Sequence, residues 1–207
     1  VFGIAPMKEG KIILEGQDTG KMTRKELSEK LGYVGQETAC VFDFTVEDII
    51  GMALYNRKNE KTSSKEIIRH AMEELKITDF SGRNIQTLSG GERKMVFLAR
   101  AVAQGVDTII LDEPTHHLDI RHQLFLLNYL KQSGKTILIV IHDLRLASYY
   151  CDTLYLMEEG RVLSHGTPQK VLTRDHVEKV FGISGYMVER EDGEADFAID
   201  FEKRIEN

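Results

Sequence analysis

The chain has 207 residues, of which 42% are hydrophobic and 29% charged, and it carries a formal net charge of −6. This length supports one folded domain with a substantial core. The acidic balance and the scattered basic residues exclude nucleic-acid binding as the main function. The longest apolar run, residues 137–141, is too short to cross a bilayer. Cys40 and Cys151 form no metal-binding spacing, and no signal peptide is recognisable, so we expect a cytoplasmic protein.

The first part of the chain predicts short strands and capped helices. Ser63, with Glu66 three residues later, forms a capping box before apolar residues at helical spacing. Thr45 and Asp48 mark another helix start in the same way. In chain order, we expect a strand at 11–15, a helix at 23–30, a strand at 31–34, and helices at 44–55 and 63–76.

From residue 90 onwards, helices and apolar strands alternate. Such βα alternation predicts a mainly parallel sheet covered by helices on both faces. Beyond residue 190 the chain is acidic, and we expect it to be loose. In chain order, we expect a helix at 90–103, a strand at 108–111, a helix at 120–131, a strand at 136–141, a helix at 145–150, strands at 153–157 and 161–164, helices at 168–172 and 175–181, and a weak strand at 186–190.

A serine and two glycines precede the helix at 90–103. Ser89 is placed as its N-cap, and Glu92 completes a capping box. Gly90 and Gly91 leave the first N–H groups of the helix open to an anion, because no Cβ blocks the approach. The stretch predicts phosphate binding, although a capping box alone is also an ordinary helix start.

Two adjacent acids, Asp112 and Glu113, end the apolar strand at 108–111. Carboxylates at the C-terminal edge of a parallel strand suit a Mg²⁺-bound phosphate and an attacking water. Adjacent acids are common in proteins. The interpretation therefore depends on the apolar strand before them and on the serine-glycine motif upstream.

The order and spacing of these motifs resemble the ABC-type ATPase family, with residues 88–92 as its signature loop and 109–115 as its Walker B strand. The resemblance runs from Lys8 to about Gly182 and is closest to subunits that serve ferric-siderophore, haem or cobalamin uptake. It implies a P-loop NTPase-like α/β fold and a single domain over 1–207. Residues 42–87 would form an inserted helical subdomain, and 186–207 a weak strand and acidic tail.

The resemblance also implies roles at the chain's own ATP site. Asp112 would support Mg²⁺, and Glu113 would polarise the hydrolytic water. Gln36 matches the Q-loop glutamine, which contacts both the Mg²⁺ and the water. His142 lies where the family has its switch histidine, which contacts the γ-phosphate. Lys94 and Met95 replace a Gln-Arg pair that is often found after the signature, and we expect them to be tolerated there.

A second set of residues would act on the ATP of an opposite subunit. By resemblance, Ser89, Gly90 and Gly91 would bind its γ-phosphate, and Asp119 would contact that subunit. Histidines near Asp119 also suggest a metal site, but their placement on a loop and a helix argues against convergent geometry. These histidines are His116, His117 and His122.

The family's phosphate loop, G-x-x-x-x-G-K-S/T, is not found in this sequence. Residues 16–21 have three intervening residues instead of four, and residues 3–11 have six. In the family this loop lies upstream of a segment like 1–10, so we expect an N-terminally truncated chain that lacks the P-loop strand. Such a chain would expose an apolar sheet edge beside 136–141 and would hydrolyse no ATP by itself.

The resemblance further implies ATP and Mg²⁺ as cofactors and a homodimer or a paired ATPase subunit as partner. A transmembrane permease would dock on residues 36–55, with an indirect link to a substrate-binding protein. The expected location is peripheral, on the cytoplasmic face of the membrane. Two alternatives remain open: a soluble ABC ATPase without a transport role, and a catalytically incomplete regulatory subunit.

Overall fold

The computed structural model describes residues 7–36, 42–55, 62–191 and 195–200. The chain divides into two compact units, Val1–Val140 and Ile141–Asn207. Each unit is described by itself.

The first unit contains a parallel sheet with the strand order β3-β4-β5. Its strands are β3 (Leu31–Val34), β4 (Thr108–Asp112) and β5 (Thr136–Val140). Because all the strands run the same way, their C-terminal ends meet at one edge of the sheet. The predicted parallel α/β arrangement is confirmed here.

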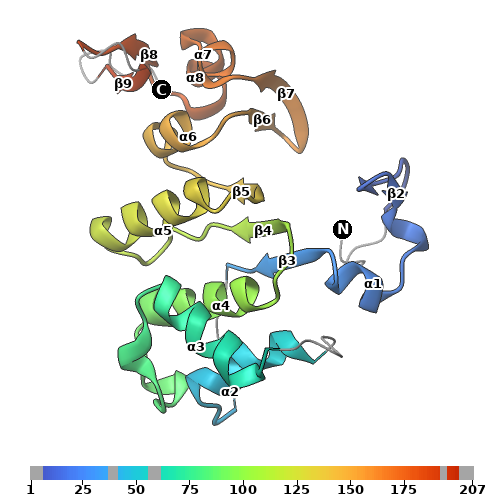
Figure 1. Ribbon diagram of the computed structural model, residues 1–207. Helices are drawn as coiled ribbons and strands as arrows, with labels where there is room; N and C mark the ends of the chain where they lie inside the picture. Colours follow the sequence, from blue (N-terminus) through green and yellow to red (C-terminus); the bar gives the residue numbers. More distant parts are fainter. Residues whose placement is uncertain (1–6, 37–41, 56–61, 192–194, 201–207) are drawn as a thin grey trace. The chain divides into compact units, whose positions relative to one another are not determined.

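The described part of the first unit also contains helices and two short strands (Figure 1). They include the helices that the capping pairs predicted, with starts within one or two residues of the expected ones. In chain order, these elements are β1 (Ile13–Leu14), β2 (Gln17–Asp18), η1 (Thr19–Lys21), α1 (Arg24–Ser28), α2 (Val46–Gly51), η2 (Met52–Leu54), α3 (Ser64–Glu74), η3 (Thr78–Phe80), η4 (Ile85–Thr87), α4 (Gly90–Ala103) and α5 (Ile120–Gln132).

The helix α4 connects the sheet to the other helices of this unit. It contacts β3 on one side and both α2 and α3 on another. The contacting helices bury apolar side chains, among them Ile50 and Leu98, which are fully excluded from solvent. This burial fixes the orientation of α4, and with it the position of the serine and glycines at its start.

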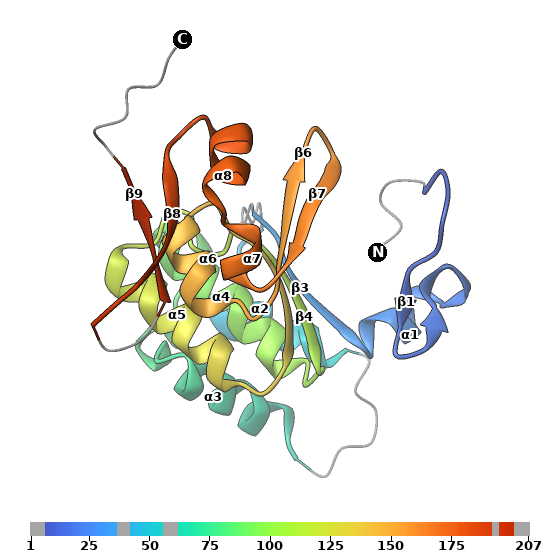
Figure 2. The same cartoon turned by 90° about the horizontal axis from the view of Figure 1, so that it is seen from above.

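One face of the sheet is packed and the other is partly open. Val34 and Leu111 point to the packed face and are fully buried, and α4 and α5 lie on the same side of the sheet (Figure 2). On the opposite face of β5, Leu138 is 54% exposed and Val140 is 46% exposed. The expectation of a sheet covered on both faces is therefore wrong for β5, where apolar side chains remain in contact with solvent.

The second unit is built from two antiparallel hairpins and short helices. Within it, α6 contacts β9 and α7 contacts both β6 and β7. In chain order, its elements are α6 (Leu144–Tyr150), β6 (Leu154–Glu158), β7 (Arg161–Gly166), α7 (Pro168–Val171), α8 (Arg174–Phe181), β8 (Gly185–Glu189) and β9 (Ala195–Ile199).

The strand β9 lies in the acidic segment that we expected to be loose, so that expectation is corrected for residues 195–199. Phe197 of β9 is 2% exposed and belongs to the core of the second unit. A Cβ at Gly185 would lie 2.5 Å from Cζ of Phe197, so the glycine makes room for the ring. Asp196 accepts a hydrogen bond from Arg145 of α6 at 3.0 Å, which further ties the hairpin to this unit.

No helix in the described part of the chain is both long enough and apolar enough to cross a membrane.

Candidate ATP-binding site

Glu113 leaves the end of β4 in a left-handed backbone conformation. Its φ is +45°, a region that non-glycine residues adopt only at a cost in energy. Its backbone N–H donates to the carbonyl oxygen of Val140, the last residue of β5, at 3.2 Å. The neighbouring strand therefore holds Glu113 in place just beyond the sheet, next to Asp112.

Gln36 lies two residues after β3 and reaches Glu113. Its Nε2 donates a hydrogen bond to Oε2 of Glu113 at 2.9 Å. Because β3 and β4 are adjacent and parallel, residues that follow the two strands meet at the same edge. The structure thus brings together two residues that the sequence placed in one catalytic site.

Lys94 is a third residue at this edge of the sheet. The sequence analysis assigned it no role. Its Nζ donates to the carbonyl oxygens of Gly35 and Gln36 at 3.0 and 2.8 Å. Burial lowers the pKa of this ammonium, and the negative charges of Asp112 and Glu113 oppose that shift. One signal was visible in the sequence: Lys94 falls on the buried face of its helix, four residues before the apolar Leu98.

The oxygen atoms at this edge fit Mg²⁺. Asp112 supplies a carboxylate, and the Gln36 carboxamide keeps its oxygen available while its nitrogen contacts Glu113. Mg²⁺ prefers oxygen ligands and takes one or two from the protein, with phosphates and waters completing its shell. Within the described ranges there is no cluster of three or more His, Cys, Asp or Glu side chains suited to a metal ion. The donor set therefore fits a metal that arrives with a nucleotide.

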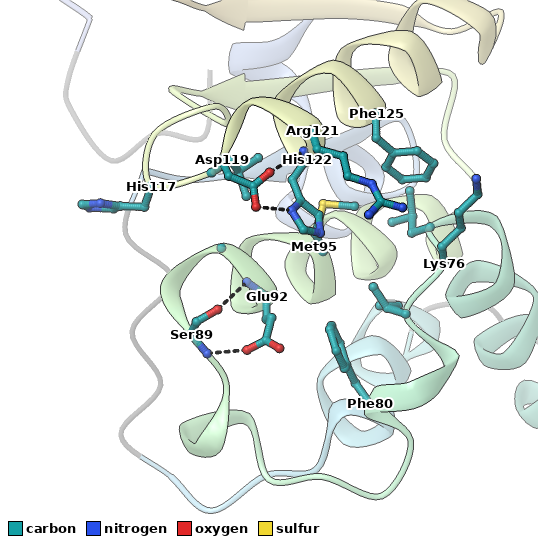
Figure 3. Close-up of a pocket in the computed structure, with 14 residues that line it drawn as sticks. Lys76, Phe80, Ser89, Glu92, Met95, His117, Asp119, Arg121, His122 and Phe125 are labelled. Atoms are coloured by element: carbon teal, nitrogen blue, oxygen red, sulfur yellow. Dashed lines mark hydrogen bonds and ion pairs between the residues drawn. The ribbon is translucent and has the colours of Figure 1, made fainter.

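The start of α4 borders a pocket of about 360 Å³ in the first unit. Ser89, Gly91 and Asp119 line it from α4 and from the segment before α5 (Figure 3). Oγ of the exposed Ser89 accepts the N–H of Glu92 at 3.2 Å, so the hydroxyl proton can be donated to another acceptor. The expected capping box is confirmed, since the Glu92 carboxylate accepts the N–H of Ser89 at 2.7 Å.

The two glycines of α4 differ in what surrounds them. A Cβ at Gly91 would lie 3.2 Å from the carbonyl oxygen of His117 and 3.1 Å from Cδ2 of Leu118. At Gly90 the nearest atom, Cβ of His117, would be 3.8 Å away, which is ordinary contact. Internal packing therefore accounts for the glycine at 91. Packing within the described residues does not require the glycine at 90, so its missing side chain leaves the start of α4 open to an approaching anion.

Asp119 caps α5 and stays exposed. Its carboxylate accepts the backbone N–H of His122 at 2.9 Å and lies 2.9 Å from Nδ1 of the same residue. These two hydrogen bonds, the backbone one first, lower the pKa of Asp119. The rings of His116 and His117 lie against each other with centroids 3.9 Å apart and a tilt of 46° between their planes.

His142 follows β5 by two residues and belongs to the second unit. It is exposed, and it precedes Asp143, whose Oδ1 caps α6 by accepting the N–H groups of Arg145 and Leu146. Gln36 and Glu113 belong to the first unit, whereas His142 belongs to the second. The structure therefore defines the position of His142 within the second unit.

A strand ending in two acids, a glutamine hydrogen-bonded to the second acid and a serine-capped glycine helix form one combination in the first unit. A protein-family model described as "ABC transporter" matches residues 1–116, the span that holds all of them. The chain belongs to the ABC transporter family. ATP hydrolysis is the activity of this family.

Several import ATP-binding proteins are similar to this chain over most of its length. A hemin import ATP-binding protein, HmuV, from Rhizobium meliloti is 36% identical over 184 residues, covering 84% of this chain and 70% of that protein. The iron(3+)-hydroxamate import ATP-binding protein FhuC from Bacillus subtilis is 33% identical, with coverage of 86% and 70%. A cobalamin import ATP-binding protein, BtuD, from Halobacterium salinarum is 32% identical, and the chain covers 46% of it.

Solved structures of ABC proteins share the fold. cbiO1 from Clostridium perfringens, part of the ABC transporter complex cbiONQ, has a TM-score of 0.71 and 28% identity, covering 86% of this chain and 73% of that one. A dimeric structure of the ATP-binding cassette MJ0796 bound to ADP and Pi has a TM-score of 0.70 and 22% identity, with coverage of 78% and 74%. The P-loop NTPase-like fold expected from the sequence is confirmed.

Proposed function

We propose that this chain is the ATP-hydrolysing subunit of an ABC importer that takes up an iron chelate, haem or cobalamin through a membrane permease. The names of the relatives support the substrate class. The hydrogen bond between Gln36 and Glu113 supports the catalytic part most directly, because it joins the glutamine and the acid that hydrolysis would need.

At the chain's own site, Glu113 orients the attacking water as a general base, and Gln36 holds the carboxylate in position. Asp112 and the Gln36 oxygen would hold Mg²⁺, which when bound neutralises charge on the phosphates. His142 would contact the γ-phosphate as the switch residue. Each of these groups lies at or near the C-terminal end of a strand of the sheet.

At the second site, Ser89 and the N–H groups at Gly90 and Gly91 would bind the γ-phosphate of ATP held by an opposite subunit. The positive end of the α4 dipole favours such an anion. Asp119 would contact that subunit next to the same pocket. The partner is a second copy of the chain or a related ATPase, as in the dimeric cassette with which this chain shares its fold.

These 207 residues contain no G-x-x-x-x-G-K-S/T motif, so by themselves they would bind ATP poorly and would not hydrolyse it. Hydrolysis therefore needs a phosphate loop from outside this sequence. We further propose that the two units work as one ATPase cassette, with residues 42–87 as its helical subdomain and 186–207 as its C-terminal extension.

Exposed apolar residues of the segment that follows Gln36 in the chain would receive the permease on the cytoplasmic face of the membrane. Phe42 is 69% exposed, Met52 44% and Tyr55 86%. Exposed apolar side chains of this kind suit a protein-protein interface when they gather in one patch. Cys40 and Val41, which the sequence placed in the same surface, lie outside the described residues.

Affinity purification from detergent-solubilised membranes tests the proposal. We expect the chain to retain a polytopic membrane protein, and the double substitution F42S/Y55S to lose it. Tyr155, which is 63% exposed in the second unit, supplies the matched control Tyr155→Ser, which should keep the partner. Retention of ribosomes instead would favour a soluble ABC ATPase. A membrane partner without ATP hydrolysis in the assembled complex would favour a catalytically incomplete regulatory subunit.

A further inference from the structure

Lys94 places a positive charge inside the first unit, on the helix that begins with the signature. The residue is 2% exposed, although its side chain ends in an ammonium group. Burying such a group costs several kcal/mol unless hydrogen bonds and opposite charges compensate for the lost water. A lysine in this position therefore needs specific partners, and the partners show what it does.

In the described part of the chain, both hydrogen-bond partners of Lys94 are main-chain carbonyls of one short segment. Nζ donates to the oxygens of Gly35 and Gln36, the residues immediately after β3. The side chain of the second of them, Gln36, holds Glu113. Hydrogen bonds from a charged donor are about twice as strong as neutral ones. One ammonium thus fixes the backbone from which the catalytic glutamine reaches its acid.

We propose that Lys94 is a positioning residue that locks the Gly35–Gln36 segment to α4, so that the signature and the catalytic glutamine move together. This inference rests on the proposed function, in which the start of α4 faces the ATP of the opposite subunit and Gln36 faces the chain's own ATP. Lys94 then couples the two ATP sites. A shift of α4 when Ser89 engages one nucleotide moves Gln36 against Glu113 at the other.

Two other side chains at this position separate charge from shape. Lys94→Met keeps the unbranched apolar stem and removes the ammonium. Lys94→Arg keeps a buried cation with several N–H donors. The lock should therefore fail in the first variant and return, at least in part, in the second.

Arg100 provides a matched control on the same helix. Its Nη2 donates to the carbonyl oxygen of Tyr33 at 3.3 Å, within β3 and before the segment that Lys94 binds. Arg100→Met therefore also removes a cation that ties α4 to the chain around β3. It leaves Gly35 and Gln36 attached to Lys94.

The test is NMR on the isotope-labelled chain, reading the side-chain amide signals of Gln36 and the hydrogen exchange of its backbone amide. We expect K94M to move the side-chain signals to the positions they take in an E113A variant and to speed backbone exchange about tenfold. K94R should restore most of the wild-type pattern, and R100M should leave it unchanged. Unchanged signals in K94M, or an equal shift in R100M, would overturn the proposal.

A folding check keeps this test decisive. Thermal unfolding of each variant establishes that the compared chains are folded, and if K94M does not fold, Lys94→Leu replaces it. That apolar side chain also carries no hydrogen-bond donor and should give the same direction of change. These measurements need neither ATP nor a permease. If the NMR results support the role of Lys94 but affinity purification retains no membrane partner, the transport function is refuted and the role of Lys94 is not.

Discussion

The side chain of Gln36 donates a hydrogen bond to the carboxylate of Glu113 at 2.9 Å, although 77 positions separate the two residues in the chain. The contact exists because β3 and β4 run side by side in the same direction and deliver both residues to one edge. The proposed catalytic roles of Gln36, Asp112 and Glu113 all depend on the geometry of this sheet edge.

Gln36→Ala removes the group that orients Glu113. In an assembled complex with a complete phosphate site, we expect kcat for ATP hydrolysis to fall by about 10²-fold, because a misoriented base loses much of its catalytic contribution. The KM for Mg²⁺-ATP should change less than kcat, since Gln36 would supply only one of the oxygen atoms around the Mg²⁺ and makes no contact with the adenosine in this account. Steady-state kinetics measures both values, and a large rise in KM at constant kcat would contradict this role.

Substitutions at Gly90 and Gly91 separate packing from ligand contact. Gly91→Ala should lower the free energy of unfolding by about 1–3 kcal/mol, because its methyl group would crowd the His117 carbonyl and Leu118. Gly90→Ala should leave the stability unchanged or raise it slightly, since alanine suits a helix better than glycine. Urea denaturation compares the two. If Gly90→Ala also weakens the closed ATP-bound dimer, the effect belongs to the ligand contact.

Capping carboxylates make the helices of the first unit sensitive to acid. Hydrogen bonds from the N-cap residues lower the pKa of Glu92, and likewise those of Glu26, Asp48 and Glu66. A carboxylate whose pKa is lower in the folded state than in the unfolded state stabilises the fold. This stabilisation is fully present above the unfolded pKa, 4.5 for a glutamate, and it is lost as the pH falls through the lower folded pKa.

Glu92→Gln tests this pH dependence at the signature helix. The amide can still accept the N–H of Ser89, but it no longer titrates. The free energy of unfolding of this variant should therefore fall less steeply below about pH 4.5 than that of the wild type. Identical slopes in urea denaturation across this range would show that the Glu92 cap does not contribute to acid sensitivity.

Leu138 should promote self-association of the isolated chain. It lies on the partly open face of β5, and its exposed side chain can bury itself against another copy. Leu138→Lys should raise the concentration at which larger species form by about tenfold, as measured by light scattering. Leu124→Lys is the control, because Leu124 is a similarly apolar residue, 41% exposed, on α5. An equal effect of both substitutions would point to net charge instead.

Local signals in the sequence predicted much of this fold. Ser89 with Glu92 and Ser63 with Glu66 marked helix starts that the structure confirms, because a capping box is made within four consecutive residues. The apolar strands at 108 and 136 were equally recognisable, since strands of a parallel sheet have continuous apolar stretches, although one face of the second strand proved to be partly open. The family resemblance predicted that Gln36 and Glu113 act in one site. Only the pairing of β3 with β4 in the sheet shows how the two residues come into contact.

Two features could not be predicted because they depend on distant partners. Lys94 binds carbonyl oxygens near Gln36, and main-chain acceptors leave no pattern in a sequence. The strand β9 lies in an acidic stretch, where the burial of Phe197 depends on the small size of Gly185 in the preceding strand. In both cases the deciding contact joins residues that lie far apart in the sequence, and the residue types do not identify the two partners.

Hydrolysis of Mg²⁺-ATP by the complex assembled with its permease and a complete phosphate site tests the central claim most directly, with wild-type chain and Glu113→Gln compared side by side. Our account predicts that the variant still binds ATP, closes its dimer and hydrolyses at least about 10²-fold more slowly than the wild type. Equal rates of hydrolysis in the two complexes would contradict it.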